Sequence, residues 1–260
     1  MPIITLTSDW GLKDHYAGAV KGTILRQMPG AVIVDISHDI PVFDLNQASF
    51  IIRNNFRNFP EGTIHIIGVS TEASIETPHV VVLFEGHYFI GCDNGIFSLV
   101  FDHQPEIIIE LDIMQDSDYF TFSTRDVFIK AACHISEGKK IELLGKKLES
   151  LNQKTTFRPI VNDGVVKGKV IYIDNYGNVF TNITEQLFQE VAGTRREFGI
   201  LFRNPSYEID KISKSYKDVP EGEMLALFSS TGYLQIAMNQ GKAASLLGLK
   251  TDDPVMIEFR

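Results

Sequence analysis

Two polar segments, far apart in the chain, carry the residue types that bind a nucleoside. The first segment, residues 171–182, reads Ile-Tyr-Ile-Asp-Asn-Tyr-Gly-Asn-Val-Phe-Thr-Asn. A plain hairpin turn needs only Asn-Gly or Asp-Gly, whereas this one also carries the carboxylate of Asp174, the ring of Tyr176 and the carboxamide of Asn178. A ring can stack on a purine, a carboxamide can bond to the base edge, and a carboxylate can accept from hydroxyl groups. The segment therefore predicts a nucleoside site, with a polar turn between two strands as the alternative.

The second segment follows the first expected strand. Residues 5–16 read Thr-Leu-Thr-Ser-Asp-Trp-Gly-Leu-Lys-Asp-His-Tyr and lead into a helical pattern at 16–27. Asp9 falls in the strand-to-helix loop, at the carboxyl end of a strand, where ligands collect in open α/β sheets. Asp14 is expected to be the N-cap or a first-turn residue of the helix. No G-x-G-x-x-G sequence follows the strand, which argues against a dinucleotide site of the Rossmann type.

A metal site is a further alternative, because Asp35, His38 and Asp39 fall within five residues of each other after the second strand. Three hard ligands at this spacing in a loop are weak evidence for an ion. The competing interpretation is that they support the loop and cap the next helix, with Phe43 lining a pocket at the same sheet end. No Ser/His/Asp or Cys/His nucleophile set has a supporting local motif.

Two further turns contain hydroxyl groups. Ser123 or Thr124 is expected to cap a helix, and Arg125 to form an ion pair with Asp126. The hydroxyl and backbone N–H groups around Ser230 could hold a carboxylate, as backbone nests do.

Composition limits the classes of protein to consider. The chain has 260 residues, 44% of them hydrophobic, which is enough for a sizeable core. Its net charge of −9 argues against a nucleic-acid partner, which requires a basic surface. The two cysteines are expected to be reduced, and they cannot make a zinc site. Neither a signal peptide nor a membrane span is recognisable, so the chain is predicted to be cytoplasmic.

The pattern of elements changes along the chain. In residues 1–150, expected strands at 3–7, 32–36, 63–69, 79–84, 88–92 and 106–110 alternate with expected helices at 16–27, 44–55 and 124–137. This alternation predicts an α/β domain with a mostly parallel sheet. A polar linker is expected at 151–157. Residues 158–260 contain short strands at 167–174, 178–183, 196–202, 224–228, 234–238 and 254–259, which indicate a small all-β, barrel-like domain.

These blocks, in this order, resemble the S-adenosylmethionine hydroxide adenosyltransferases, a family related to the fluorinase and the chlorinase. The resemblance covers essentially the whole chain and rests on residues 7–11 (Thr-Ser-Asp-Trp-Gly), 14–16, 34–38 (Val-Asp-Ile-Ser-His), 59–63 (Phe-Pro-Glu-Gly-Thr), 93–95, 121–122, 125–128, 173–178, 181–182 and 230–234 (Ser-Thr-Gly-Tyr-Leu). It implies S-adenosylmethionine as a small-molecule substrate without a further cofactor, and a homotrimer with sites between subunits. We expect no metal, and the lack of a membrane span also leads us to expect no membrane partner.

The resemblance also implies a role for each matching residue. Asp9 would hold the ribose hydroxyls and Asp14 the methionine ammonium, while Phe43 and Phe122 would form walls of the pocket. In the C-terminal half, Asp174 and Ser230 would hold the amino-acid end, Tyr176 would pack on the nucleoside, Asn178 would read the adenine edge, and Tyr216 would supply another stacking ring.

The chain departs from the family at the residues that activate water. Members that use hydroxide carry an Asp, an Arg and a His for this purpose; here Ser70, Thr77 and Ser123 stand at those positions. The Pro-Gly-Val-Gly that follows the Asp is also missing. Glu72, Glu76 and His79 are the nearest residues that could substitute.

This departure leaves several functions open. The resemblance implies an SN2 displacement at C5′ of the ribose that gives adenosine and L-methionine. A positioned base typically contributes about 10²–10⁴-fold. The chain could therefore be a slow hydrolase, a binder of S-adenosylmethionine or adenosine without turnover, or an enzyme that uses another nucleophile such as a halide. A metal-dependent hydrolase built on Asp35, His38 and Asp39 is the remaining alternative.

Overall fold

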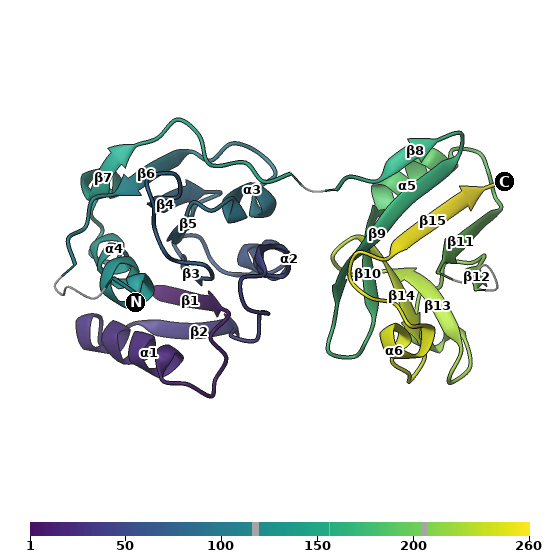
Figure 1. Ribbon diagram of the computed structural model, residues 1–260, viewed down its shortest axis with the longest axis horizontal. Coiled ribbons are helices and arrows are strands. Elements are labelled where there is room, and N and C mark those ends of the chain that lie inside the picture. Colours follow the sequence, from purple (N-terminus) through teal and green to yellow (C-terminus); the bar gives the residue numbers. More distant parts are fainter. Residues whose placement is uncertain (116–119, 156, 204–206) are drawn as a thin grey trace. The chain divides into compact units, whose positions relative to one another are not determined.

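The protein is described by a computed structural model that covers residues 1–115, 120–155, 157–203 and 207–260. It divides into two compact units, Met1–Thr155 and Thr156–Arg260, each with its own sheet (Figure 1). Within the predicted linker, Leu151 is buried and the backbone N–H of Asn152 donates to the carboxylate of Asp93. The backbone N–H of Lys154 also donates to Oγ of Ser98 at 2.9 Å, so the chain is held against the first unit as far as residue 154.

A seven-stranded mixed sheet forms the centre of the first unit. Its strand order is β2-β1-β3-β5-β4-β6-β7. The strands are β1 (Ile3–Ser8), β2 (Val32–Ser37), β3 (Ile64–Gly68), β4 (His79–Phe84), β5 (His87–Cys92), β6 (Ile107–Leu111) and β7 (Gly145–Lys147). The pairs β2–β1, β1–β3 and β3–β5 are parallel, whereas β5–β4, β4–β6 and β6–β7 are antiparallel.

The prediction of an α/β unit is thus confirmed, but the expectation of a mostly parallel sheet was wrong. The reason is the connection between β4 and β5. Glu85 and Gly86 both have positive φ, 49° and 74°, as the tight turns that join antiparallel strands require. The chain therefore reverses within two residues, and no helix crosses over between these strands.

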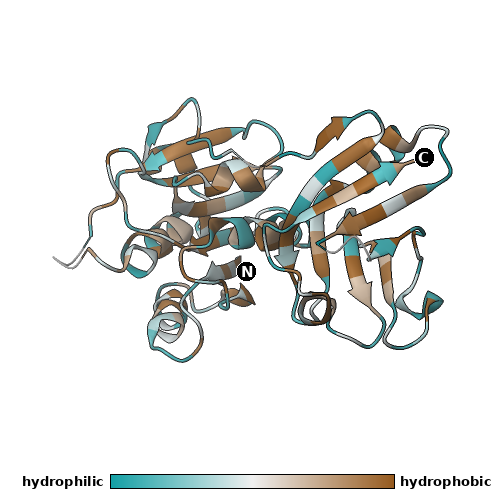
Figure 2. Ribbon diagram, turned by 45° about the vertical axis from the view of Figure 1, so that its right-hand side comes forward, coloured by the Kyte–Doolittle hydropathy of each residue, from teal (hydrophilic) through white to brown (hydrophobic). Residues whose placement is uncertain are grey.

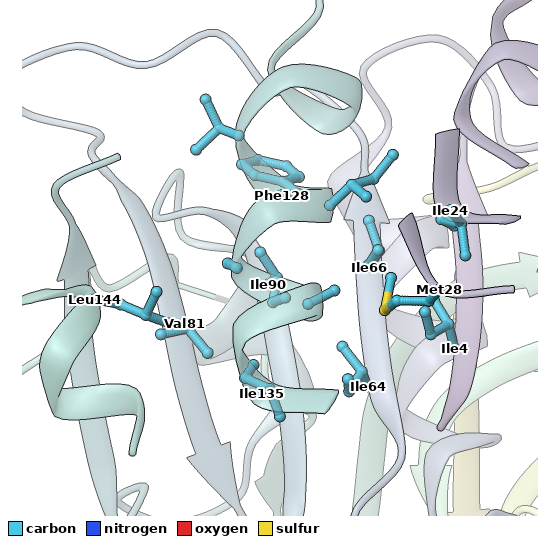
Figure 3. Packing of buried hydrophobic residues seen from close by; sticks show 14 of the residues in the cluster. Ile4, Ile24, Met28, Ile64, Ile66, Val81, Ile90, Phe128, Ile135 and Leu144 are labelled. Carbon is cyan, nitrogen blue, oxygen red and sulfur yellow. The ribbon is translucent and has the colours of Figure 1, made fainter. Parts of the chain in front are cut away.

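Helices cover both faces of this sheet. On one face, α1 (Tyr16–Gln27), η2 (Thr124–Phe128) and α4 (Ile129–Ser136) bury Val20, Ile24, Phe128 and Ile135. Figure 3 shows the helix that carries Phe128 and Ile135 against the strands that carry Ile64, Ile66 and Ile90. On the other face, α2 (Leu45–Arg53) and α3 (Ile96–Val100) pack with a second apolar cluster. Short 3₁₀ turns occur at η1 (Phe56–Asn58) and η3 (Ile141–Leu144).

The second unit is an antiparallel sheet that nearly closes into a barrel. Its order is β12-β11-β15-β9-β10-β14-β13, with β8 paired to β9. A bridge between Ile212 and Ala226 links the two ends of this order. The elements are β8 (Ile160–Asn162), β9 (Val165–Ile173), β10 (Val179–Thr184), α5 (Glu185–Ala192), β11 (Phe198–Phe202), β12 (Glu208–Ile209), η4 (Tyr216–Asp218), β13 (Met224–Phe228), β14 (Tyr233–Met238), α6 (Ala243–Leu247) and β15 (Pro254–Phe259).

In both units the strands are more hydrophobic than many of the loops that connect them. Figure 2 shows hydrophobic residues concentrated on the strands and hydrophilic residues in many of the connecting loops. The polar segments singled out in the sequence lie at strand ends, where their side chains are not needed for the core. Among the described residues, no helix is both long and apolar enough to cross a membrane.

Candidate functional site

The first group of candidate residues lies where the parallel strands β1, β2 and β3 end. The Oγ of Ser8, the last residue of β1, lies 2.6 Å from Nδ1 of His38, just beyond β2. The backbone N–H of Gly11 donates to the carbonyl of His38 at 2.8 Å. Asp9, between these contacts, accepts a 2.9 Å hydrogen bond from the backbone N–H of Phe43 on its Oδ2. The loops after β1 and β2 are therefore tied together around Asp9.

Aromatic rings extend this group to the start of η2. Trp10 covers Gly68, the last residue of β3, so closely that a Cβ there would collide with its ring. The ring of Phe122 meets Trp10 edge-on at 5.8 Å and Tyr16 at 5.3 Å between centroids, and the guanidinium of Arg125 lies 5.1 Å from its centroid. The structure thus brings Phe122 to the same sheet edge as Asp9.

Two residues at this edge have a left-handed backbone without being glycine. Phe43 has φ 65° and Ser70 has φ 49°. Such conformations cost about 1–3 kcal/mol each and concentrate at functional sites. Phe43 is held in this conformation by its bond to Asp9 while 70% of its surface stays exposed. A large exposed ring with an imposed backbone suits the wall of a ligand site.

Asp14 does not have the capping role that its position predicted. Helix α1 begins at Tyr16 with His15 as its N-cap, and the side chain of His15 makes no capping hydrogen bond to a described residue. The prediction was wrong because the loop keeps a turn conformation through residue 15. Asp14 is exposed and makes no hydrogen bond to a described residue, so its carboxylate is available to a ligand.

The three positions at which the resemblance leads us to expect the water-activating groups, Ser70, Thr77 and Ser123, lie in two segments. Ser70 follows β3, and its carbonyl accepts from the side chain of Asn94 at 3.0 Å. Thr77 is bonded elsewhere, since its Oγ1 lies 2.8 Å from Oγ of Ser74 and its carbonyl accepts from the thiol of Cys92. The segment is thus fixed by its own contacts, and the hydroxyl of Thr77 is already bonded to Ser74.

Ser123 is buried at the start of η2, next to a second buried hydroxyl. Ser123 is the N-cap residue, as expected, but its side chain makes no capping hydrogen bond. The Oγ1 of Thr124 is fully buried and has no hydrogen-bond partner among the described residues. The predicted ion pair between Arg125 and Asp126 is confirmed, with contacts of 2.6 and 2.7 Å.

Among the three neighbouring residues considered as replacements for the expected charged groups, His79 is partly buried and already hydrogen-bonded. Its Nε2 is 2.8 Å from the carbonyl of Thr71, to which it donates, and its ring meets Phe128 edge-on. Burial lowers the pKa of His79, with the bond to Thr71 opposing the shift. A neutral imidazole that donates to a carbonyl is not a replacement for the missing acid or guanidinium. Glu72 and Glu76 are exposed.

The structure does not support a metal at Asp35, His38 and Asp39. Nζ of Lys21 lies 2.5 Å from Asp35, His38 lies between Ser8 and Asp35, and the ligand atoms of the three residues do not converge on one point. Ser8, His38 and Asp35 do form a serine–histidine–aspartate row that the sequence pattern did not reveal. Nε2 of His38 lies 3.1 Å from Oδ1 of Asp35 but makes no hydrogen bond to a described residue, and Ser8 is 1% exposed, so the row lacks both the oriented base and the accessible hydroxyl of a nucleophile set.

The second group of candidate residues lines one hollow in the second unit. Its volume is about 1010 Å³, and Asp174, Tyr176, Asn178, Tyr216 and Ser230 all contribute to it. Both oxygens of Asp174 bind Asn178, accepting from its backbone N–H at 2.8 Å and from its side-chain amino group at 2.9 Å. The hollow is of the size that encloses a nucleoside-sized ligand.

Glycine at position 177 permits this turn. Gly177 has φ 79°, and a Cβ there would lie 2.9 Å from Cβ of Lys242. Its carbonyl accepts from the backbone N–H of Ala244 at the start of α6, and its N–H donates to the carbonyl of Asp174. The turn is therefore held between two strands and α6, which places the ring of Tyr176, 77% exposed, at the rim of the hollow.

Gln235 is a residue of the hollow that the sequence did not single out. It lies on β14, is 2% exposed, and its Oε1 accepts a 2.9 Å hydrogen bond from the hydroxyl of Tyr216. Burial, followed by the charge of Asp174, raises the pKa of Tyr216. A polar residue alternating with apolar ones on a strand gives no signal of its own, so only the structure identifies it.

The turn that carries Ser230 is organised by its neighbours. Oγ of Ser229 lies 2.6 Å from Oγ1 of Thr231 and accepts from the backbone N–H of Thr231 at 3.3 Å. Gly232 closes the turn with φ 76°. Ser230 is exposed and has no hydrogen-bond partner among the described residues, which leaves its hydroxyl for a ligand.

Comparisons with known proteins agree along the whole chain. Residues 4–145 match the SAM (S-adenosylmethionine) hydroxide adenosyltransferase N-terminal domain, and residues 168–256 match the corresponding C-terminal domain. The chain is 29% identical to an (R)-S-adenosyl-L-methionine hydrolase of Thermus thermophilus, over 96% of this chain and 97% of that one. It is 25% identical to a fluorinase of Nocardia brasiliensis, over 99% and 97% of the two chains.

A solved structure shows the same fold. An uncharacterized conserved protein from Thermotoga maritima superposes with a TM-score of 0.89 at 30% identity, covering 98% of this chain and 99% of that one.

Proposed function

The chain belongs to the SAM hydroxide adenosyltransferase family, and from this premise we propose that it binds S-adenosylmethionine and catalyses attack of water, as hydroxide, at C5′ of the ribose. The products are adenosine and L-methionine. The name (R)-S-adenosyl-L-methionine hydrolase, carried by relatives of full length, supports this proposal. The observation that carries it is the convergence of Asp174, Tyr176, Asn178, Tyr216 and Ser230 on one hollow.

Each group of residues has a part in this reaction. Asp9 holds the ribose hydroxyls and Asp14 holds the methionine ammonium. Phe43 and Phe122 form walls of the pocket. Tyr176 and Tyr216 pack on the nucleoside, Asn178 reads the base, and Asp174 and Ser230 hold the amino-acid end. Because the residues fall in both units, we propose a homotrimer in which the first unit of one subunit completes the site of another. A cytoplasmic location is part of the same proposal.

The reaction needs little activation by the protein. The sulfonium already makes methionine a good leaving group, so the main tasks are aligning the nucleophile and excluding competing water. No cofactor is required for these tasks. Without a charged group at Ser70, Thr77 or Ser123, the loss of general-base help lowers the rate by about 10²–10⁴-fold. We therefore propose a slow hydrolase.

A second candidate, an enzyme that uses a halide, is favoured by one observation. Ser123 and Thr124 present two adjacent buried hydroxyls, and that of Thr124 has no partner in the described part of the chain. Hydroxyl donors suit a small anion better than they suit the activation of water. The products would then be a 5′-halo-5′-deoxyadenosine and methionine.

The test is incubation of the purified protein with S-adenosylmethionine, chromatography of the products, and titration calorimetry on the same sample. Adenosine and methionine above the no-protein control support the hydrolase, and added fluoride or chloride tests the second candidate. Binding without any product would leave a nucleoside-binding protein. Absence of both binding and product would overturn the proposal.

A further inference from the structure

One buried residue, His38, contacts the chain on both sides of Asp9. Its Nδ1 lies 2.6 Å from Oγ of Ser8, and its carbonyl accepts from the backbone N–H of Gly11 at 2.8 Å. Its ring stacks on Trp10, with 6.0 Å between the centroids and 20° between the planes. Ser8 is 1% exposed and His38 is 4% exposed, so water does not compete for the contact between them. The backbone that carries Asp9 is therefore held by His38 from before and after this residue.

A register shift between β1 and β2 brings His38 to this place. Leu6 lies opposite Asp35, whereas the next residue of β1, Thr7, lies opposite Ser37. Strand β2 thus has one extra residue here, as in a β-bulge. Bulges re-aim side chains and are over-represented next to active sites. With an unbroken register, the last residue of β1 would lie opposite Ser37 and would not meet the imidazole of His38.

The direction of the Asp9 carboxylate depends on this backbone. Its Oδ2 accepts from the backbone N–H of Phe43 at 2.9 Å, and its Oδ1 bonds to no residue that the structure describes. A carboxylate with one such bond keeps a single direction only if its own backbone keeps one conformation. The contacts of His38 with Ser8, Trp10 and Gly11 supply that restraint.

We propose that His38, through its contact with Ser8, is a positioning residue that sets the direction in which Asp9 meets the ribose hydroxyls. This inference rests on the proposed function, because it needs Asp9 to be the residue that binds the ribose. Its effect is specific. Loss of the contact weakens recognition of the two hydroxyl groups and leaves binding of the base, which the proposed function assigns to the second unit, unchanged.

The first experiment compares adenosine with 2′,3′-dideoxyadenosine, which lacks both hydroxyl groups, by titration calorimetry on the full chain. The unaltered chain is expected to bind adenosine at least about tenfold more tightly, the usual effect of a hydrogen bond to a charged group. Ser8→Ala removes the hydroxyl that contacts His38. It is expected to reduce the ratio of the two affinities by about fivefold, the effect of one neutral hydrogen bond.

Thr5→Val is the matched control. Thr5 lies farther from Asp9 along β1, and its Oγ1 lies 2.7 Å from Nδ1 of His65 in a contact of the same kind. Both residues of this contact are also buried. Its loss is expected to leave the ratio of the two affinities unchanged, even where it lowers stability.

Two variants at position 38 test whether a polar group is needed there. His38→Asn keeps a polar atom near the position of Nδ1, whereas His38→Leu fills the space without one. The Asn variant is expected to retain more of the preference for adenosine than the Leu variant. Thermal melting of every variant checks that it is folded.

The outcomes separate the inference from the proposed function. If Ser8→Ala weakens binding of adenosine and dideoxyadenosine equally, or changes the ratio no more than Thr5→Val does, the contact has only a structural role and the inference fails. If the unaltered chain binds both nucleosides with the same affinity, Asp9 does not recognise the hydroxyls; the inference then fails while the proposed reaction stands. If the unaltered chain binds neither S-adenosylmethionine nor any nucleoside, the proposed function and the inference both fall.

Discussion

The carboxylate of Asp9 accepts a 2.9 Å hydrogen bond from the backbone N–H of Phe43, which joins two loops that are far apart in sequence. Phe43 has a left-handed φ of 65°, a conformation that a bulky residue adopts at a cost of about 1–3 kcal/mol. Oδ2 of Asp9 thus fixes Phe43, and its Oδ1 bonds to no residue that the structure describes. If Asp9 holds the ribose hydroxyls, as proposed above, substrate binding and the position of Phe43 are coupled through one side chain.

Asp9→Ala is expected to weaken binding of adenosine by about 1.5–3 kcal/mol, the usual worth of a hydrogen bond to a charged group. The loss of support for Phe43 adds to the effect. Titration calorimetry measures it, with Asp39→Ala, an exposed carboxylate on the neighbouring loop, as control. Unchanged affinity in the Asp9 variant would show that the nucleoside binds elsewhere.

The elements whose apolar residues recur at a clear helical or strand period could be predicted from the sequence. Helix α1 spans Tyr16–Gln27 and strands β4, β13 and β15 have the expected bounds. Helix α3 was missed because Ile96, Phe97, Leu99 and Val100 are all buried, so it has no polar face to produce a helical pattern. The mixed sheet does not follow from the alternation of strands and helices, because the reversal at Glu85 and Gly86 joins β4 to β5 without a crossover helix.

The candidate site was predictable only where its residues are close in sequence or match a family motif. Asp174, Tyr176 and Asn178 belong to one turn, and their clustering in the chain becomes clustering in the hollow. Gln235 could not be found in this way, because its neighbour in the site is set by the register of β10 with β14. The row formed by Ser8, His38 and Asp35 likewise depends on the pairing of β1 with β2.

Gly68→Ala is expected to disturb the first group of site residues without touching a ligand. A Cβ at this position collides with the ring of Trp10, which must then shift together with Phe122. Overpacking of this kind typically costs about 1–3 kcal/mol of stability. The free energy of unfolding measured with urea and the affinity for S-adenosylmethionine are both expected to fall. Gly30→Ala, where a Cβ meets nothing within 4 Å, is the control; equal behaviour of the two variants would contradict the role of Trp10.

Stability is expected to fall in mild acid because of a buried histidine pair. Burial, with a smaller effect of His87, lowers the pKa of His65 to about 3, and burial also lowers that of His87. His65 lies 2.7 Å from the hydroxyl of Thr5 and 3.2 Å from His87. Below about pH 6.5, His65 takes up a proton in the unfolded chain but stays neutral in the folded chain. The free energy of unfolding therefore decreases as pH falls from about 6.5 towards 3, by up to about 1.4 kcal/mol per pH unit for this residue.

Urea unfolding at pH 7 and pH 5 measures this slope. His65→Gln removes the titrating group and is expected to flatten the dependence on pH, even if it lowers stability at both values. His15→Gln, on an exposed side chain with no ion pair to a described residue, is the control and should keep the slope. The same slope in the His65 variant would assign the acid sensitivity to other groups.

Restoring Asp, Arg and His at the three substituted positions is expected to raise the rate of adenosine release. Ser70→Asp suits the left-handed backbone, which Asp tolerates better than most residues. Thr77→Arg breaks the contact with Ser74, and Ser123→His must find room at a position that is 4% exposed. Because a positioned base contributes about 10²–10⁴-fold, even partial restoration is measurable by chromatography, while the affinity for S-adenosylmethionine should stay similar. No increase in rate, with binding retained, would mean that the backbone contacts of residue 77, whose carbonyl accepts from the thiol of Cys92 and from the N–H of Ser74, hold this segment in a shape where the introduced groups cannot reach the attacking water.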